Sequence, residues 1–263
     1  MAEEDQFVVI RVYQKHDEKE CFQLLREGVM STVQPSFLTA LTREVTFQII
    51  ITMAAVMFVF IGLSPTICIL SIPATVVVIY VSVYIAHVKR ASALAFDASD
   101  IEKTFLSSKY TCFWVAELYE ISSPHKCSKQ QNIAIIQQAQ LDAILLDDKI
   151  YKKKIIGIVG VNRCDVMYES AWIRRMTINS KYQQMGIGPA LLNEAINFCK
   201  NKGYQSIEVV TSECQDGARK LYLQKGFKLR QLYHKSILGP LVQVLMYQFT
   251  LAIPTNNAEK KVE

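Results

Sequence analysis

The sequence lacks the common signatures of metal sites and of disulfide frameworks. Its seven cysteines are odd in number, and no two of them have CxxC spacing. They also do not combine with the four histidines into a zinc-type pattern. We therefore expect free thiols in a reducing compartment and no bound metal.

The sequence also lacks a strong excess of positive or negative charge. The chain carries 29 Lys and Arg against 24 Asp and Glu, and the net charge of +5 is scattered, which is too diffuse for a nucleic-acid partner. The acidic N-terminus, MAEEDQFVVI, lacks the basic and apolar regions of a secretory signal. We therefore expect any membrane targeting to come from inside the chain.

The longest uncharged stretch is the most informative absence. Between Val45 and Val88 there is no Asp, Glu, Lys or Arg. One helix of that length would extend about 66 Å at roughly 1.5 Å per residue, about twice the ~30 Å hydrocarbon core of a bilayer. Gly62, Ser64 and Pro65 lie near its middle and favour a break.

The break predicts a membrane hairpin of two helices, Val45–Leu63 and Thr66–Val88, with Pro73 as a kink in the second. Both flanks then face one side of the bilayer, and because they are basic we expect that side to be the cytosol. Two alternatives stay open. One is a single span with the rest of the chain in a lumen, and the other is a very apolar helix pair in a soluble core.

Outside this stretch, hydrophobic periodicity alternates between strands and helices, which predicts an α+β fold. The expected strands are Phe7–Tyr13, Cys112–Leu118, Lys154–Asn162, Ala171–Ile178 and Ser206–Thr211. The expected helices are Asp17–Met30, Asp97–Leu106, Ile133–Leu146, Ile187–Lys202 and Asp216–Lys225. Hydropathy alone would allow a membrane span within Phe227–Ala252, but its Gly239–Pro240 interruption and β-branched residues favour two strands.

A glycine-containing turn follows the expected strand Ala171–Ile178. There Gly186, Ile187 and Gly188 open a helix. Such a turn exposes backbone N–H groups at a helix N-terminus, where the helix dipole favours an anion. The pattern predicts a pyrophosphate-binding loop, although an ordinary tight turn has the same pattern.

This turn carries a family resemblance. The segment QQMGIGPALL resembles the QxxGxG pattern of the GNAT acetyltransferases, and LYLQKGF at Leu221–Phe227 resembles the LYxxxGF of their next helix. The blocks VIRVYQKHD, DASDIEKTFLSSKYTCFWVAE, IGIVG and RMTINSKYQQMGIGPAL are similar to the N-acetyltransferase 8, or camello-like, family, and they extend the resemblance over nearly the whole chain.

The resemblance implies a GNAT fold, α+β with a mixed central sheet and an inserted apolar helical membrane hairpin. It divides the chain into a first strand and helix at 1–44, the hairpin at 45–88, the remainder of the acetyltransferase domain at 89–255, and a polar tail at 256–263. It also implies acetyl-CoA as the cosubstrate. The implied coenzyme-binding residues are Met176, Thr177, Ile178, Gln183, Gln184, Met185, Gly186, Ile187, Gly188 and Gln215.

The sequence departs from the family at three places. Gln183 stands where close relatives carry arginine, which removes a charge near the phosphates. Gln215 stands where many GNAT enzymes have asparagine. The connection Glu120–Lys153 is longer than the usual turn, so access of the substrate is expected to differ.

The resemblance implies that Tyr222 is the general acid that protonates the departing thiolate, although a core tyrosine would fit the same helix. Backbone N–H groups around Met176–Ile178 would bind the thioester oxygen. Arg175 matches an arginine of aspartate-acetylating relatives and would bind a substrate carboxylate, unless it is a surface cation.

No general base can be assigned from the sequence. Glu169, Glu208 and Glu213 are near the relevant strands but read as solvated carboxylates, and a water chain would also serve. Cys214 has no nearby histidine in the sequence, so we expect a small apolar filler. The histidines His87 and His125 look isolated from any ligand partner.

Three functions fit these features. The first is acetylation of a small-molecule amine, such as a cysteine S-conjugate or an amino acid, at the cytosolic face of the endoplasmic reticulum or Golgi. The second is acetylation of protein lysines on membrane clients. The third is a membrane scaffold with a degenerate acetyltransferase fold that affects adhesion, and the intact glycines with Tyr222 argue against it.

Overall fold

An eight-stranded mixed sheet forms the centre of the molecule, in a computed structural model that describes residues 6–98, 101–121, 134–137, 151–164, 169–238 and 242–254. The strands are β1 (Gln6–Val12), β2 (Cys112–Ile121), β3 (Ala134–Gln137), β4 (Tyr151–Arg163), β5 (Ser170–Ile178), β6 (Ser206–Ser212), β7 (Lys228–Leu238) and β8 (Val242–Ala252). They lie in the order β3-β1-β2-β4-β5-β6-β8-β7. Two pairs, β1 with β3 and β5 with β6, are parallel, and the others are antiparallel. The predicted α+β fold with a mixed sheet is confirmed.

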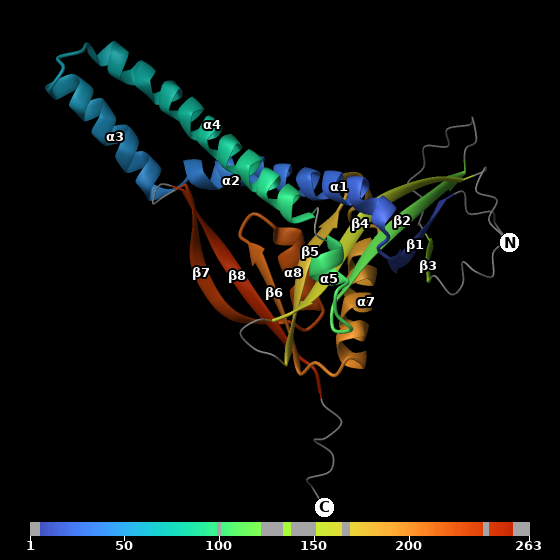
Figure 1. The fold of residues 1–263 in the computed structure, drawn as a ribbon. Helices are drawn as coiled ribbons and strands as arrows, with labels where there is room; N and C mark the ends of the chain where they lie inside the picture. Colours follow the sequence, from blue (N-terminus) through green and yellow to red (C-terminus); the bar gives the residue numbers. More distant parts are fainter. Residues whose placement is uncertain are drawn as a thin grey trace, which may run out of the picture.

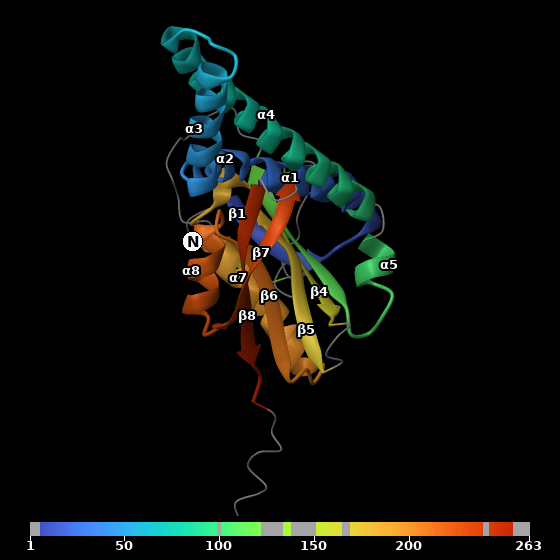
Figure 2. The ribbon, with the colours of Figure 1, turned by 90° about the vertical axis from the view of Figure 1, so that its left-hand side faces the viewer.

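Helices cover both faces of this sheet (Figures 1 and 2). They are η1 (Lys15–Asp17), α1 (Glu18–Met30), α2 (Val33–Leu41), α3 (Glu44–Val59), α4 (Pro65–Ala98), α5 (Ile101–Phe105), η2 (Ser180–Tyr182), α7 (Ile187–Asn201) and α8 (Asp216–Gln224). On one face, Leu191 and Leu192 of α7 join the main core. On the other, Leu24 and Leu25 of α1 pack on Phe113 of β2. Because each helix buries one apolar stripe, the sheet lies between two layers of helix.

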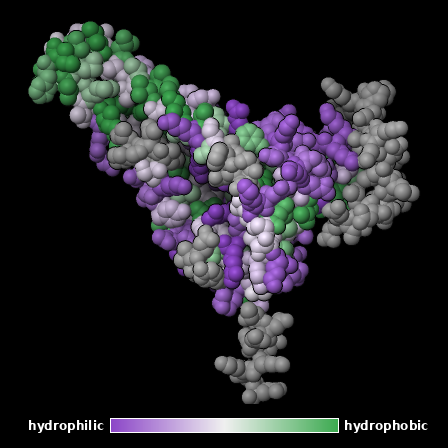
Figure 3. Space-filling model, viewed as in Figure 1, coloured by the Kyte–Doolittle hydropathy of each residue, from purple (hydrophilic) through white to green (hydrophobic). Residues whose placement is uncertain are grey.

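Helices α3 and α4 form a hairpin that projects away from the sheet (Figure 1). Its outer part is apolar and exposed, and it forms the green arm of Figure 3. The side chains of Val59, Phe60 and Leu70 are 69%, 83% and 69% exposed. By length and composition, Pro65–Leu94 is one helix that could cross a membrane, and only 17% of its most apolar window is buried. That exposure is unlike a helix in the core of a soluble protein.

The two apolar helices were expected, but the second runs beyond its expected end at Val88. Its later part packs on the domain, where Val83, Ala86, His87 and Ala91 are buried. These positions recur at helical spacing, so α4 changes from an exposed apolar arm into an amphipathic helix of the domain. The same extension places Asp97 inside α4, although we expected it to begin the next helix.

Two further expectations from sequence need correction. A helix was expected at Ile133–Leu146, but Ala134–Gln137 is the edge strand β3, paired with β1 from Phe7↔Ala134 to Ile10↔Gln137. Short apolar runs do not separate helix from strand by periodicity, and here an available sheet edge decided. The rest of that expected helix lies outside the described residues. Helix α2 was not expected at all.

Candidate active site

Strands β5 and β6 pair along only part of their length. Their register runs from Ser170↔Ser206 to Ile173↔Val209, and no further residues of the two strands pair. A bulge in the pairing of β4 with β5 adds to the divergence, and Arg175 lies there with φ 58°. Such a conformation costs an L-residue roughly 1–2 kcal/mol. The end of β5 therefore turns backbone groups toward β6 that no strand uses.

The loop after β5 has the backbone conformation that the predicted anion cradle needs, and its role in binding stays a prediction. Gln184 has φ 65° and Gly186 has φ 82°, and such left-handed residues turn successive amides toward one point. Within the described part of the chain, the amides of the run 184–188 donate to no protein acceptor. A Cβ added at Gly188 would come within 2.9 Å of Ile178 Cδ1, so the helix start lies tightly over the end of β5. The donors are free and held in place, which is what a pyrophosphate site requires.

The two glutamines flanking this region have structural partners. The side-chain amide of Gln183 donates to the carbonyl of Ile178 at 3.3 Å. The Oε1 atom of Gln215 accepts from Thr211 Oγ1 at 3.0 Å and from Ser212 N at 3.3 Å. Gln215 therefore braces the turn from β6 into α8, and only its amide nitrogen would be left for a coenzyme.

Tyr222 of α8 is buried beside the diverging strands. It is 4% exposed, and its hydroxyl donates to Met176 Sδ of β5 at 3.7 Å. Its ring packs near Phe227, with 5.6 Å between the ring centroids. Burial raises the pKa of Tyr222 well above its usual value, so the phenol keeps its proton at neutral pH. A protonated phenol next to β5 is able to donate a proton, and the role of Tyr222 as the general acid stays a prediction.

This geometry agrees with comparisons against known proteins. The model of the acetyltransferase (GNAT) family matches residues 108–227. Rat N-acetyltransferase family 8 member 3 is 26% identical over 220 residues, which cover 83% of this chain and 83% of that protein. Mouse N-acetyltransferase 8B is 26% identical over 59% of this chain and 54% of its own length. The chain therefore contains a GNAT acetyltransferase domain and is similar in sequence to N-acetyltransferase 8 proteins.

The chain is thus a GNAT enzyme, an acetyl-CoA-dependent N-acetyltransferase. Among similar solved structures is a GNAT family acetyltransferase from Elizabethkingia anophelis with acetyl-CoA bound, 18% identical with a TM-score of 0.36, covering 59% of this chain and 82% of that one. No group of three metal-ligating side chains occurs among the described residues.

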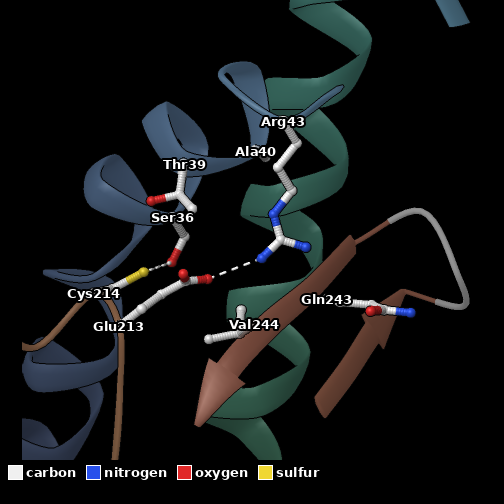
Figure 4. Close-up of a pocket in the computed structure, with 8 residues that line it drawn as sticks. All are labelled: Ser36, Thr39, Ala40, Arg43, Glu213, Cys214, Gln243 and Val244. Carbon is white, nitrogen blue, oxygen red and sulfur yellow. Dashed lines mark hydrogen bonds and ion pairs between the residues drawn. The ribbon is translucent and has the colours of Figure 1, made fainter. Parts of the chain in front are cut away.

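A pocket lies between α2, the end of β6 and the start of β8 (Figure 4). Its volume of about 230 Å³ counts the open solvent at its mouth, and little of that space is enclosed. Its lining residues are Ser36, Thr39, Ala40, Arg43, Glu213, Cys214, Gln243 and Val244. Arg43 donates to Glu213 Oε1 at 2.9 Å, and Leu245 N donates to the same oxygen at 3.1 Å. The pocket therefore offers one cation and one anion side by side.

The carboxylates considered as general bases have different surroundings from those expected. Glu208 is only 2% exposed; it accepts from Arg230 at 2.9 Å and from Gln248 at 3.2 Å. Glu213 is half-buried in the ion pair with Arg43. The prediction of solvated carboxylates is therefore wrong for these two, and only Glu169 is exposed. Both of these carboxylates are therefore already engaged by an arginine side chain.

The expectation that Cys214 has no histidine nearby is also wrong. Ser36 Oγ lies 3.3 Å from Cys214 Sγ and 3.2 Å from Nε2 of His87, which comes from α4. His87 is therefore not isolated. His125 lies outside the described residues.

No pattern in the sequence indicated these contacts, because α2 was not expected and the three residues are far apart in the chain. Arg175 is half-buried in the bulge of β5, and its role toward a substrate carboxylate stays a prediction. The long connection before β4 also reaches the site. Ile135 Cδ1 of β3 lies 3.6 Å from the position of a Cβ built on Gly186, so β3 flanks the cradle.

Proposed function

We propose that this enzyme moves the acetyl group of acetyl-CoA to the amine of a small zwitterionic molecule, such as an amino acid or a cysteine S-conjugate, at a membrane surface. One observation supports this acceptor class above all others. Arg43 and Glu213 lie together in a half-buried pocket next to the end of β6. An α-amino acid carries one charge of each sign at a similar spacing, so each charge would find an opposite partner.

The proposed reaction uses the chain in three places. The amides of Gln184–Gly188 bind the pyrophosphate, and the backbone of Met176–Ile178 binds the pantetheine arm and the thioester oxygen. The neutral amine attacks the carbonyl carbon and the carbon–sulfur bond breaks. Tyr222 donates its proton to the departing sulfur, which its protonated state at neutral pH allows. Arg175 is a second candidate for the substrate carboxylate.

The test of this function uses the full chain in detergent or vesicles with a defined pair of acceptors. We expect acetyl-CoA binding in the micromolar range, its loss in Gly186→Glu, and acetylation of S-benzylcysteine in preference to a lysine-containing peptide. If the enzyme acetylates the peptide in preference to S-benzylcysteine, the proposed small-molecule function is wrong and the result favours protein lysine acetylation. Binding of acetyl-CoA without any transfer would favour the scaffold.

We also propose that the α3–α4 hairpin inserts into the bilayer and leaves the catalytic domain in the cytosol, at the endoplasmic reticulum or Golgi. Its tip is apolar, with Phe60 83% and Ile61 62% exposed. A tip that reached water on the far side would favour polar residues, so an apolar tip fits insertion from one side. Both arms then return to the same surface.

Two measurements separate the topologies. The double substitution Phe60→Asp with Ile61→Asp is expected to release the protein from vesicles in a flotation assay, whereas Leu232→Asp, at an exposed site on β7, is not. An N-glycosylation acceptor placed in the 256–263 tail stays unmodified if the domain is cytosolic. Modification of that tail would instead establish a single span with a luminal domain.

A further inference from the structure

We call the pocket that contains Arg43 and Glu213 the acceptor pocket, because we propose that it binds the acceptor amine. Three side chains from three separate segments form a hydrogen-bonded row beside it. Cys214 follows β6, Ser36 lies on α2, and His87 lies on the buried part of α4. Ser36 Oγ is 3.3 Å from the cysteine sulfur and 3.2 Å from His87 Nε2. Ser36 and His87 are 7% and 3% exposed, and Cys214 is half-buried at the pocket wall. Figure 4 shows the sulfur and the serine hydroxyl facing each other.

The protonation pattern of this row follows from one fixed contact. His87 Nδ1 lies 2.8 Å from the carbonyl oxygen of Val83, which can only accept, so Nδ1 carries a proton. In neutral His87 the Nε2 atom is then an acceptor. The hydroxyl of Ser36, which donates to the sulfur of Cys214 in the structure, then turns its proton to Nε2 and accepts from the thiol. In charged His87 the Nδ1 contact is unchanged, Nε2 donates to Ser36, and Ser36 donates to a thiolate.

These three side chains thus have two arrangements in which every polar atom has a hydrogen-bond partner. The two differ by the transfer of one proton from the sulfur to the imidazole. In a relay of this kind the sulfur of Cys214, which faces the pocket, accepts the proton. The positive charge is carried by the buried His87. We propose that Cys214, Ser36 and His87 are the proton relay that deprotonates the acceptor ammonium. The proposal rests on the function proposed above, and it supplies the general base that the engaged Glu208 and Glu213 do not.

The proton balance is as follows. The acceptor ammonium gives one proton to the sulfur of Cys214 as the thiol proton passes to Ser36 and the hydroxyl proton passes to His87 Nε2. The neutral amine then attacks the thioester. The nitrogen loses a second proton as the amide forms, which balances the proton that Tyr222 gives to the CoA sulfur. His87 returns its proton to solvent by the same path.

The first test does not depend on acetyl transfer. The full chain in detergent is treated with iodoacetamide at pH 7.5, and alkylation of each cysteine is followed by mass spectrometry. We expect Cys214 to react at least about tenfold faster than Cys112, another half-buried cysteine, because burial raises the pKa of the Cys112 thiol to about 11. Ser36→Ala and His87→Gln should slow Cys214 about tenfold, and Ser36→Thr should restore its rate.

The second test measures turnover of S-benzylcysteine. General acid–base catalysis contributes typically 10²–10⁴-fold, so Cys214→Ala, Ser36→Ala and His87→Gln should each lower kcat by about 100-fold. The loss should shrink toward pH 10, where solvent itself deprotonates the amine. The double variant of Cys214 and His87 should be no worse than either single variant, because the residues act as a unit. Cys112→Ala and Ser92→Ala, which lie outside the pocket, are the matched controls.

Each outcome decides between distinct conclusions. Unchanged alkylation of Cys214 in Ser36→Ala and His87→Gln overturns the relay, even if the enzyme is active. An acetyl group trapped on Cys214 without acceptor also overturns it, because the thiol would then be a nucleophile. Should the wild-type protein bind acetyl-CoA but acetylate no amine, the proposed function fails while the alkylation result still judges the relay.

Discussion

Arg43 donates a hydrogen bond to Glu213 at 2.9 Å across a sequence separation of 170. Arg43 is the residue directly before α3, the first arm of the apolar hairpin, and Glu213 directly follows β6. The ion pair therefore joins the base of the hairpin to the open end of the diverging strands. If the hairpin lies in a bilayer, the acceptor pocket lies at the bilayer surface.

The first prediction concerns the specificity of this pocket. Arg43→Met should raise the KM for S-benzylcysteine about tenfold, because the substrate carboxylate loses its cation. The KM for acetyl-CoA, whose proposed site is the loop 184–188, should stay within twofold. Steady-state kinetics on vesicles provide the measurement. Arg90→Met, an exposed cation at the end of the hairpin, serves as the control, and an equal effect there would show that only bulk charge matters.

The second prediction separates backbone strain from coenzyme binding. Gly186 and Gly203 have φ 82° and 76°, and either substitution by alanine costs roughly 1–2 kcal/mol of strain. Nothing lies within 4 Å of a Cβ at Gly203, and that glycine is at the far end of α7. Both variants should lower the melting temperature by similar amounts. Only Gly186→Ala should weaken acetyl-CoA binding, by about tenfold or more in calorimetry.

The third prediction concerns Tyr222. Tyr222→Phe keeps the ring packing near Phe227 and removes only the hydroxyl that contacts Met176. The value of kcat should fall by about 100-fold while the Kd for acetyl-CoA changes less than twofold, since loss of a general acid affects the chemical step. An unaltered kcat would assign Tyr222 to the core alone.

The fourth prediction concerns stability at alkaline pH. Burial raises the pKa of Tyr204 to about 12, and its hydroxyl donates to the carbonyl of Tyr110 at 2.6 Å. The folded state therefore holds this proton more tightly than the unfolded chain, whose tyrosine pKa is about 10. The resulting stabilisation is complete below about pH 10 and is lost as the pH rises toward 12. Thermal melting from pH 9 to 12 measures it, and Tyr204→Phe should flatten the dependence.

The sequence by itself determined the elements that depend on residues close to one another in the chain. The hydrophobic periods placed α7 and the strands β5 to β8 within a few residues of where they lie, because each element buries one face of its own. The left-handed turn at Gly186, where we predict the anion cradle, was equally readable, since only a glycine takes that backbone conformation without strain. The uncharged run marked the hairpin arms, since charge is what excludes a segment from a bilayer.

Tertiary structure alone decided the acceptor side of the site. Nothing near Cys214 in the sequence indicates His87 or Ser36, because those contacts form only when α2 and α4 fold back over the end of β6. Glu208 likewise has the sequence context of a surface carboxylate, but it is buried and pairs with a partly exposed arginine of a strand that follows it in the chain. Side-chain partners across long separations depend on packing, and a linear pattern records only which faces are apolar.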